Sequence, residues 1–422
     1  MNYKAAPMLA LAVCLAVAGP VRADVVTEWN EIADGMTALA PPFKNRIMAM
    51  VQVAVHDALN SIDQRYEGYL GLPSANSGAS PGAAVAAAAY RVLLGVVPAQ
   101  AAALGVIYNG KIAGLSCPLS HPTCINEGIV AGEAAAFAML SLRANDGSAT
   151  PHLPYTLPAA PGVHQPTPPN FPAPQFAGWA HVTPFVINSA SQFRAEPSEI
   201  LDLLGEVFTR DYNEVKRVGS ANSEANGDRT ADQSAFARFW ASGGANFNAV
   251  TRIIVAGRGL DEWEHARLLA LVNLALHDDT ITIFDTKYAY NFWRPATAIR
   301  AGASDGNPAT DPDPNWVSYQ VTPPYPDYTC GLPNNTGAAL EVLRRYFGTD
   351  DIAYTFTVAG IQRSFSSLSQ AGAEAIDARV FGGMHFRTGC VVGLKQGEKV
   401  GRFIILHALK EIKGKAKGRD NH

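Results

Sequence analysis

Apolar residues recur at intervals of three or four positions through most of the chain. Between residues 28 and 63 this spacing is carried by Trp29, Ile32, Met36, Ile47, Met50, Val51, Val55 and Leu59. Residues three or four apart lie on one face of an α-helix, so the pattern predicts two amphipathic helices in this segment. Pro41-Pro42 separates them, because proline interrupts a continuing helix.

The same spacing predicts helices along the rest of the chain. They cover 84–96, 99–115, 126–144, 197–217, 230–241, 246–257, 260–282, 283–294, 336–347, 366–380 and 391–411. No run of alternating apolar and polar residues longer than four positions indicates a strand. The sequence therefore predicts an all-α fold, a bundle of long helices with long Pro-rich loops.

Two segments break the helical pattern. Residues 147–184 are rich in Pro, Gly and Thr, and residues 301–328 are rich in Pro and Asp. A long irregular segment inside a domain is usually functional or covers the surface. We interpret 147–184 as a covering strap with four aromatic anchors, and a linker between independent domains is the alternative. The anchors are Phe171, Phe176, Trp179 and Phe185.

The N-terminus has the form of a secretory signal peptide. Lys4 precedes an apolar run over 8–18, and the small-residue site ends at Ala23, after which cleavage is expected. The run is shorter than the roughly 20 apolar residues that span a bilayer. No later stretch is expected to span a membrane either. The sequence predicts a secreted or periplasmic protein with a signal peptide over 1–23 and one domain over 24–422.

Composition and charge narrow the classes of partner. The 422 residues are 48% hydrophobic and 17% charged, with a formal net charge of −4. These values are typical of a globular protein and do not indicate a nucleic-acid or membrane-surface partner. The basic residues between Lys410 and Arg419 are interpreted as a solvated end.

Two of the cysteines lie close together in a Pro-rich loop. An exported protein can hold disulfides, so Cys117 and Cys124 are predicted to pair. A metal site that includes His121 is the rival interpretation. Two cysteines and one histidine are too few for a closed zinc site.

Candidate chemistry is concentrated in the C-terminal half. Lys287 and Arg294 are two helical turns apart, so both cations are expected to point the same way, among aromatic residues. Such a pair suits an anion, although two unrelated surface charges would show the same spacing. A turn that contains Gly331 enters the next helix and offers free backbone N–H groups to an anion. Further on, Arg379 precedes His385, which follows a Gly-Gly bend; such a histidine is a nucleophile, a metal ligand or a structural residue.

Taken in order, these segments resemble the vanadium haloperoxidase and type 2 phosphatidate-phosphatase (acid phosphatase) superfamily. The family pattern is Lys-x6-Arg-Pro, then Pro-Ser-Gly-His, then Arg-x5-His. Lys287 and Arg294 match the first part, and Arg379 and His385 match the third. The stretches HQPTPPNF, DYNEVKRVGS and KYAYNFWRPATAIR also resemble the secreted bacterial haloperoxidase-like branch, and the likeness covers roughly 27–406.

The middle motif departs from the family pattern. Where the family has Pro-Ser-Gly-His, this chain has Thr329-Cys330-Gly331-Leu332. Cysteine is a weaker hydrogen-bonding partner than the serine it replaces. Leu332 cannot transfer a proton, whereas general acid–base groups typically contribute about 10²–10⁴-fold in rate. Three other histidines are candidates to supply the missing group: His56, His265 and His277.

The resemblance implies a role for each matched residue. A tetrahedral oxyanion would be held by Lys287, Arg294, Cys330, the N–H of Gly331 and Arg379, with His385 on its axial side. If the anion is vanadate, His385 is the metal ligand and peroxide oxidises a halide or an organic substrate. If it is a phosphate ester, His385 is the nucleophile and forms a phosphohistidine. Three functions stay open: a vanadate-dependent haloperoxidase, a secreted phosphatase, and an altered member that binds an oxyanion without ordinary turnover.

The remaining cysteines are expected near the same site. Cys330 lies in the middle motif and Cys390 follows His385 by five residues. In an exported protein two neighbouring cysteines tend to oxidise, so we predict a Cys330–Cys390 disulfide. It would require Cα atoms roughly 4.4–6.8 Å apart. Two separate buried thiols are the alternative.

Overall fold

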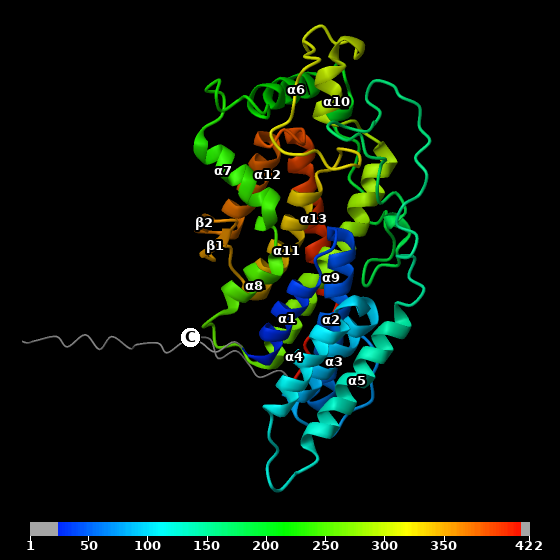
Figure 1. Cartoon of the computed structure of the whole chain (residues 1–422), viewed down its shortest axis with the longest axis vertical. Helices are drawn as coiled ribbons and strands as arrows, with labels where there is room; N and C mark the ends of the chain where they lie inside the picture. Colours follow the sequence, from blue (N-terminus) through cyan, green and yellow to red (C-terminus); the bar gives the residue numbers. More distant parts are fainter. Residues whose placement is uncertain (1–23, 415–422) are drawn as a thin grey trace, which may run out of the picture.

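The computed structural model describes residues 24–414, so the predicted signal peptide and most of the basic tail lie outside the described residues. The described chain is largely helical, with one β-hairpin (Figure 1), which confirms the all-α prediction. The helices are α1 Val25–Met36, α2 Pro41–Ile62, α3 Pro81–Val96, α4 Ala101–Ala113, α5 Cys124–Leu142, α6 Glu206–Val218, α7 Ala231–Phe239, α8 Phe247–Val255, α9 Glu262–Tyr290, α10 Pro295–Arg300, α11 Gly331–Phe347, α12 Leu368–Phe381 and α13 Arg387–His407.

Helix α9 is the central element. It has 29 residues, begins with a capping box between Asp261 and Glu264, and packs against α1, α2, α8, α11 and α13. Two helices, over 260–282 and 283–294, were predicted here. That prediction was wrong, because no helix-breaking residue interrupts the buried run, and the helix ends only where Asn291 adopts a left-handed conformation with φ 51°.

The largest hydrophobic core joins both halves of the chain around α9. It includes Trp29 of α1, Val51 of α2, Leu271 of α9 and Leu340 of α11. The extent of a single domain over 24–422 stays a prediction. The predicted break between two helices is present: α1 ends at Met36, and the two prolines occupy the first positions of α2, where proline is favoured.

Helices α11 and α13 approach closely and hold the start of α11 in place. A Cβ atom on Gly397 would lie 1.8 Å from the backbone oxygen of Asn334. No side chain fits such a distance, so glycine is required at this crossing. The backbone N–H of Cys330, which precedes α11, also donates to the carbonyl of Gly389 in α13.

The sequence pattern missed one hairpin and overextended one helix. Strands β1 (Tyr354–Val358) and β2 (Ile361–Phe365) pair antiparallel, with Tyr354 opposite Phe365. Their alternation of more and less exposed residues is short and interrupted by a turn, which explains why it was not recognised. The helix predicted over 197–217 is reduced to α6, preceded by a single 3₁₀ turn at Glu199–Leu201.

The strap, residues 147–184, runs along one side of the molecule between α5 and α6 (Figure 1). Three of its four predicted anchors are buried, namely Phe176, Trp179 and Phe185 just beyond its end. Phe171 is 60% exposed, so its prediction as an anchor was wrong.

The carboxylate of Asp278 on α9 accepts the N–H groups of 185–187 at 2.7, 2.7 and 2.9 Å. It thereby fastens the end of the strap to the central helix.

We expect Asp278→Ala to lower the free energy of unfolding by about 3 kcal/mol or more, because it leaves three buried N–H groups without their acceptor. Denaturant titration measures the change. Asp285→Ala is the matched control on the same helix, since its partner Arg194 is largely exposed and such pairs contribute up to about 1 kcal/mol. Equal losses in the two variants would contradict the anchoring role.

By length and composition, α5 among the described helices could cross a membrane, and α3 with Pro98–Ala113 passes the same test only as one bent span. The expectation that no stretch after the N-terminal run is apolar enough was therefore wrong. Core helices also pass this test. One face of α5 packs on α3, where a Cβ on Gly132 would lie 2.2 Å from the backbone oxygen of Ala84.

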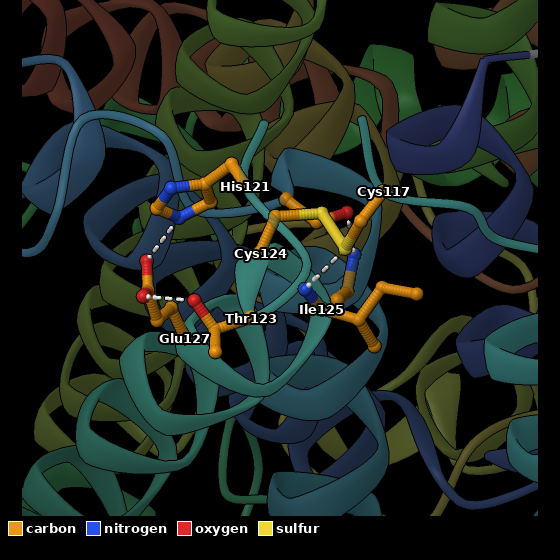
Figure 2. The surroundings of a disulfide bond; sticks show 8 residues. Cys117, His121, Thr123, Cys124, Ile125 and Glu127 are labelled. Carbon is orange, nitrogen blue, oxygen red and sulfur yellow. Dashed lines mark hydrogen bonds and ion pairs between the residues drawn. A yellow bond between two sulfur atoms is a disulfide. The ribbon is translucent and has the colours of Figure 1, made fainter. Parts of the chain in front are cut away.

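The predicted Cys117–Cys124 disulfide is present and closes the loop before α5 (Figure 2). His121 does not complete a metal site there, because its Nε2 lies 2.8 Å from Glu127. Thr123 donates to the other oxygen of that carboxylate at 2.8 Å. Over residues 24–414 no group of three or more His, Cys, Asp or Glu side chains is arranged to hold a metal ion.

Candidate functional site

A cavity of about 410 Å³ brings together residues from α2, the strap, α9, α11 and the segment that leads into α13. Lys287, Arg379, His385 and Gly331, all predicted site residues, lie on its wall. Arg294 lies behind the wall in contact with His385. Much of the remaining wall is apolar and includes Phe176, Trp240, Ile283, Phe284 and Leu332.

Lys287 and Arg294 reach this site by a different backbone path from the one predicted. Lys287 lies in the last turn of α9, but the helix ends at Tyr290. Arg294 is the N-terminal cap of α10, with extended backbone angles of φ −88° and ψ 155°. The two cations therefore converge because the chain turns after α9, and not because two helical turns separate them.

All three N–H groups of the Lys287 ammonium are directed at backbone carbonyls. Nζ donates to Pro326, Asp327 and Thr329 at 2.8, 2.9 and 2.6 Å. An ammonium has three donors, so none remains for a ligand in this arrangement. Lys287 fixes the loop that leads into α11 and acts on the cavity through its charge. Burial, together with the neighbouring Arg294, lowers its pKa to about 7.

The two arginines keep buried donors without partners. Arg294 donates from Nε to Tyr325 at 2.7 Å and from Nη1 to Met384 at 2.9 Å. Its Nη2, and the Nε of Arg379, have no hydrogen-bond partner among residues 24–414. A buried donor left unpaired costs free energy, so two such donors beside one cavity indicate a site for an acceptor, and an anion is the strongest one.

His385 is held between a cation and a carboxylate. Its Nε2 accepts from Nη1 of Arg294 at 2.9 Å, so the ring proton belongs on Nδ1, which lies 2.8 Å from Oδ1 of Asp327. Burial and the cations Arg294, Lys287 and Arg379 hold the pKa of His385 well below its ordinary value. The ring is therefore neutral and directs the lone pair of Nε2 toward the guanidinium. Burial raises the pKa of Asp327 to about 7.

The structure places Cys330 behind the cavity. Its buried side chain packs with Ile376 and Cys390. Both are free cysteines, so the expected closeness is confirmed but the expected Cys330–Cys390 disulfide is not present. Leu332, two residues further along the chain, lies on the cavity wall, whereas Cys330 does not.

None of the three histidines considered as replacements lies on the described cavity wall. His56 contacts Asp57 at 2.7 Å, and His265 pairs with Asp24. His277 packs edge-on against Phe185. Sequence reasoning missed His164, a buried strap histidine that also lies outside the described cavity wall but whose pKa is lowered by burial and by the site cations Arg294 and Lys287. Its one signal was its position in the stretch HQPTPPNF, which carries part of the family resemblance.

A polar cluster adjoins the apolar wall one turn along α11 from Leu332. Asn335 donates to the carboxyl group of Asp279 at 2.6 Å and accepts from Asn45 at 3.1 Å. Burial raises the pKa of Asp279 well above its ordinary value and that of the adjacent Asp278 to about 6. Asp279 is thus a neutral acid at pH values where an exposed aspartate is ionised.

These raised pKa values predict that Asp278 and Asp279 contribute stability at acidic pH that is lost as the pH rises. The unfolded chain releases the two protons near pH 4, whereas the folded protein keeps them to higher pH, so stability declines as pH rises through the folded pKa values. Thermal unfolding between about pH 5 and about pH 8 measures this slope. We expect Asp279→Asn to melt higher than the parent at the upper pH and to show a shallower slope. An unchanged slope in Asp279→Asn would show that Asp279 is ionised in the fold.

Comparison with known proteins gives matches in sequence and in structure. Residues 267–414 match the model of the VCPO second helical-bundle domain. The vanadium chloroperoxidase of Curvularia inaequalis is 28% identical over an alignment of 189 positions, and the match covers 37% of this chain and 30% of that protein. The matched stretch thus spans less than a third of the length of that curated relative.

Two solved structures share the fold over nearly the whole chain. A bacterial vanadium-dependent iodoperoxidase superposes with a TM-score of 0.78 at 24% identity and covers 93% of this chain and 99% of its own. A holo-type bacterial vanadium-dependent chloroperoxidase gives a TM-score of 0.70 at 19% identity, with 92% and 98% covered. At these identities the likeness establishes the fold.

Proposed function

Because the chain belongs to the vanadium haloperoxidase family, we propose that it binds vanadate at the cavity beside His385 and uses peroxide to oxidise a halide. The observation that carries the proposal is the pair of buried, unpartnered guanidinium donors, Arg294 Nη2 and Arg379 Nε, next to a neutral imidazole. An oxyanion would satisfy both donors, and His385 would hold it through its imidazole nitrogen.

The donor set fits vanadate in charge and in chemistry. Arg294 and Arg379 supply charge-assisted hydrogen bonds, and Lys287 adds positive charge. The first turn of α11, beginning at Gly331, supplies backbone N–H groups and the positive end of a helix dipole. His385 supplies Nε2, and imidazole nitrogen is a common ligand of transition metals.

Bound vanadate would supply Lewis-acid activation of peroxide, and the chain's own residues would set its position and charge. Oδ1 of Asp327 lies 2.8 Å from Nδ1 of His385, so the carboxyl group favours a ring proton on that nitrogen, away from the ligand side. With Nε2 of His385 holding the anion, Nη1 of Arg294, which now donates to that nitrogen at 2.9 Å, would be free to donate to the anion. The apolar wall around Leu332 limits water near the reacting atoms and accepts a halide or a small organic substrate.

Export from the cytoplasm is part of the proposal. The Cys117–Cys124 disulfide supports it, because disulfides persist in oxidising compartments. Cys330 and Cys390 are compatible with such a compartment because both are fully buried.

Titration of the purified protein with orthovanadate, followed by calorimetry and then by assays of iodide and bromide oxidation with peroxide, tests the proposal. We expect saturable binding and vanadate-dependent oxidation of at least one halide. Hydrolysis of a phosphate ester, inhibited by vanadate and without halide oxidation, would instead support the phosphohistidine alternative. Binding without either reaction would support an altered member that only holds the oxyanion.

A further inference from the structure

We propose that His164, on the strap, contacts the bound oxyanion and exchanges protons with peroxide, the role that Leu332 in the middle motif cannot fill. The inference rests on the proposed function, since it requires an oxyanion at this site. It assigns chemistry to a segment outside the three motifs, and it explains how turnover can continue without a histidine at position 332.

The strap is tied to the end of α9 at the position of His164. The backbone N–H of His164 donates to the carbonyl of Asn291 at 2.7 Å, and Trp293 donates to Gly162 at 3.0 Å. Val163 and Phe292 form an isolated antiparallel bridge between them. This short pairing lies on the segment that joins Lys287 to Arg294. It therefore holds His164 against the segment between the two cations of the site, and the charges of both cations act on its imidazole.

The imidazole of His164 is buried but lacks a hydrogen-bond partner. The residue is 1% exposed, and neither Nδ1 nor Nε2 has a partner within residues 24–414. Nearby Tyr155 donates to the backbone oxygen of His164 and not to its ring. On the same strap, the buried hydroxyl of Thr167 also lacks a partner among these residues. Two buried polar groups without partners on one segment indicate that a ligand completes their hydrogen bonds.

The surrounding charges make His164 responsive to an anion. Burial, then Arg294 and Lys287, lower its pKa to about 3, so the ring is neutral before the anion binds. The groups that face it are those two cations and the phenol of Tyr155, whose ring centroid lies 5.8 Å away. An oxyanion beside the cations offsets their repulsion and shifts the imidazole pKa upward, toward the range in which proton exchange is efficient.

The proton balance of halide oxidation needs such a group. Peroxide and halide with one proton give hypohalous acid and water, as the O–O bond breaks and the halide loses two electrons. A base must accept a proton from the incoming peroxide, and an acid must return one to the departing oxygen so that it leaves as water. A ring nitrogen of His164 can do both in turn, whereas the thiol of Cys330 lies behind the cavity wall.

The test compares His164→Phe and His164→Asn with His277→Phe as the matched control. His277 is also fully buried, and it lies about 15 Å along α9 from Lys287 at 1.5 Å per residue. Phenylalanine keeps the ring volume, and asparagine keeps a hydrogen bond but cannot exchange protons. Vanadate and phosphate affinities are measured by calorimetry, and halide oxidation is measured as a function of pH. Thermal melting establishes that each variant is folded.

We expect His164→Phe to bind both anions about 10-fold more weakly, as the loss of one hydrogen bond to a charged group implies. Asparagine should restore most of the affinity, but both variants should oxidise halide about 10²-fold more slowly. The control should match the parent in both measurements. Adding Leu332→His to His164→Phe should recover much of the rate.

If His164→Phe matches the parent in affinity and rate, this inference fails while the proposed function stands. A parent protein that binds neither vanadate nor phosphate overturns both.

Discussion

The His385→Ala variant is expected to lose measurable vanadate binding and at least about 10³-fold of vanadate-dependent halide oxidation. In the parent protein, Nε2 of His385 carries the lone pair that would bond the metal, and its neutrality is maintained by burial and by the surrounding cations. Alanine removes this ligand. The guanidinium of Arg294 keeps its bonds to Tyr325 and Met384, so the other side of the site stays in place.

His407→Ala is the control for this prediction. His407 is exposed at the end of α13, and its Nδ1 contacts only the carbonyl of Phe403 among the described residues. We expect this variant to bind vanadate and oxidise halide as the parent does. Calorimetry and peroxide-dependent iodide oxidation give the two readings. Halide oxidation at the parental rate in His385→Ala would exclude His385 as the vanadium ligand.

Part of the site could be predicted because its spacing is local. Lys287 and Arg294, and likewise Arg379 and His385, are close in sequence, so a motif identifies each pair. The physical reason offered for the first pair was nevertheless wrong, because α9 ends at Tyr290 and the chain continues in an extended conformation. The use of all three Lys287 donors by backbone carbonyls could not be read from spacing, since the acceptors lie 39 to 42 residues away.

The strap shows where sequence reasoning stops. Its composition predicts an irregular cover, and its buried aromatic residues show why it adheres to the bundle. A backbone pairing with residues near 291 decides which strap residue faces the cations, and no periodicity reports that pairing. The same limit applies to Cys330 and Cys390. Sequence places them near each other, but only the packing shows that their thiols contact each other behind the wall and that Leu332 faces the cavity.

Replacing Arg379 should weaken anion binding without lowering the stability of the fold. Arg379 is 7% exposed, its Nε is buried without a partner, and no hydrogen bond or ion pair joins its side chain to another residue within 24–414. Arg379→Met keeps much of the apolar stem and removes the charge. Before an anion binds, we expect the variant to melt at the same temperature as the parent or higher, because an uncompensated buried charge is destabilising. Vanadate affinity should fall about 10- to 100-fold, and halide oxidation about 10²–10³-fold.

Arg387→Met is the control, and we expect it to lower stability without weakening anion binding. Arg387 lies eight residues further along the chain but is paired with Glu214 at 2.8 Å and with Asp377 at 2.6 Å. Its loss removes these pairs, so the melting temperature should fall while vanadate affinity stays near that of the parent. Stability that falls in Arg379→Met without any loss of affinity would show that its charge serves the fold. A gain or no change in stability, together with weaker binding, would show that Arg379 is held unpaired for an anion.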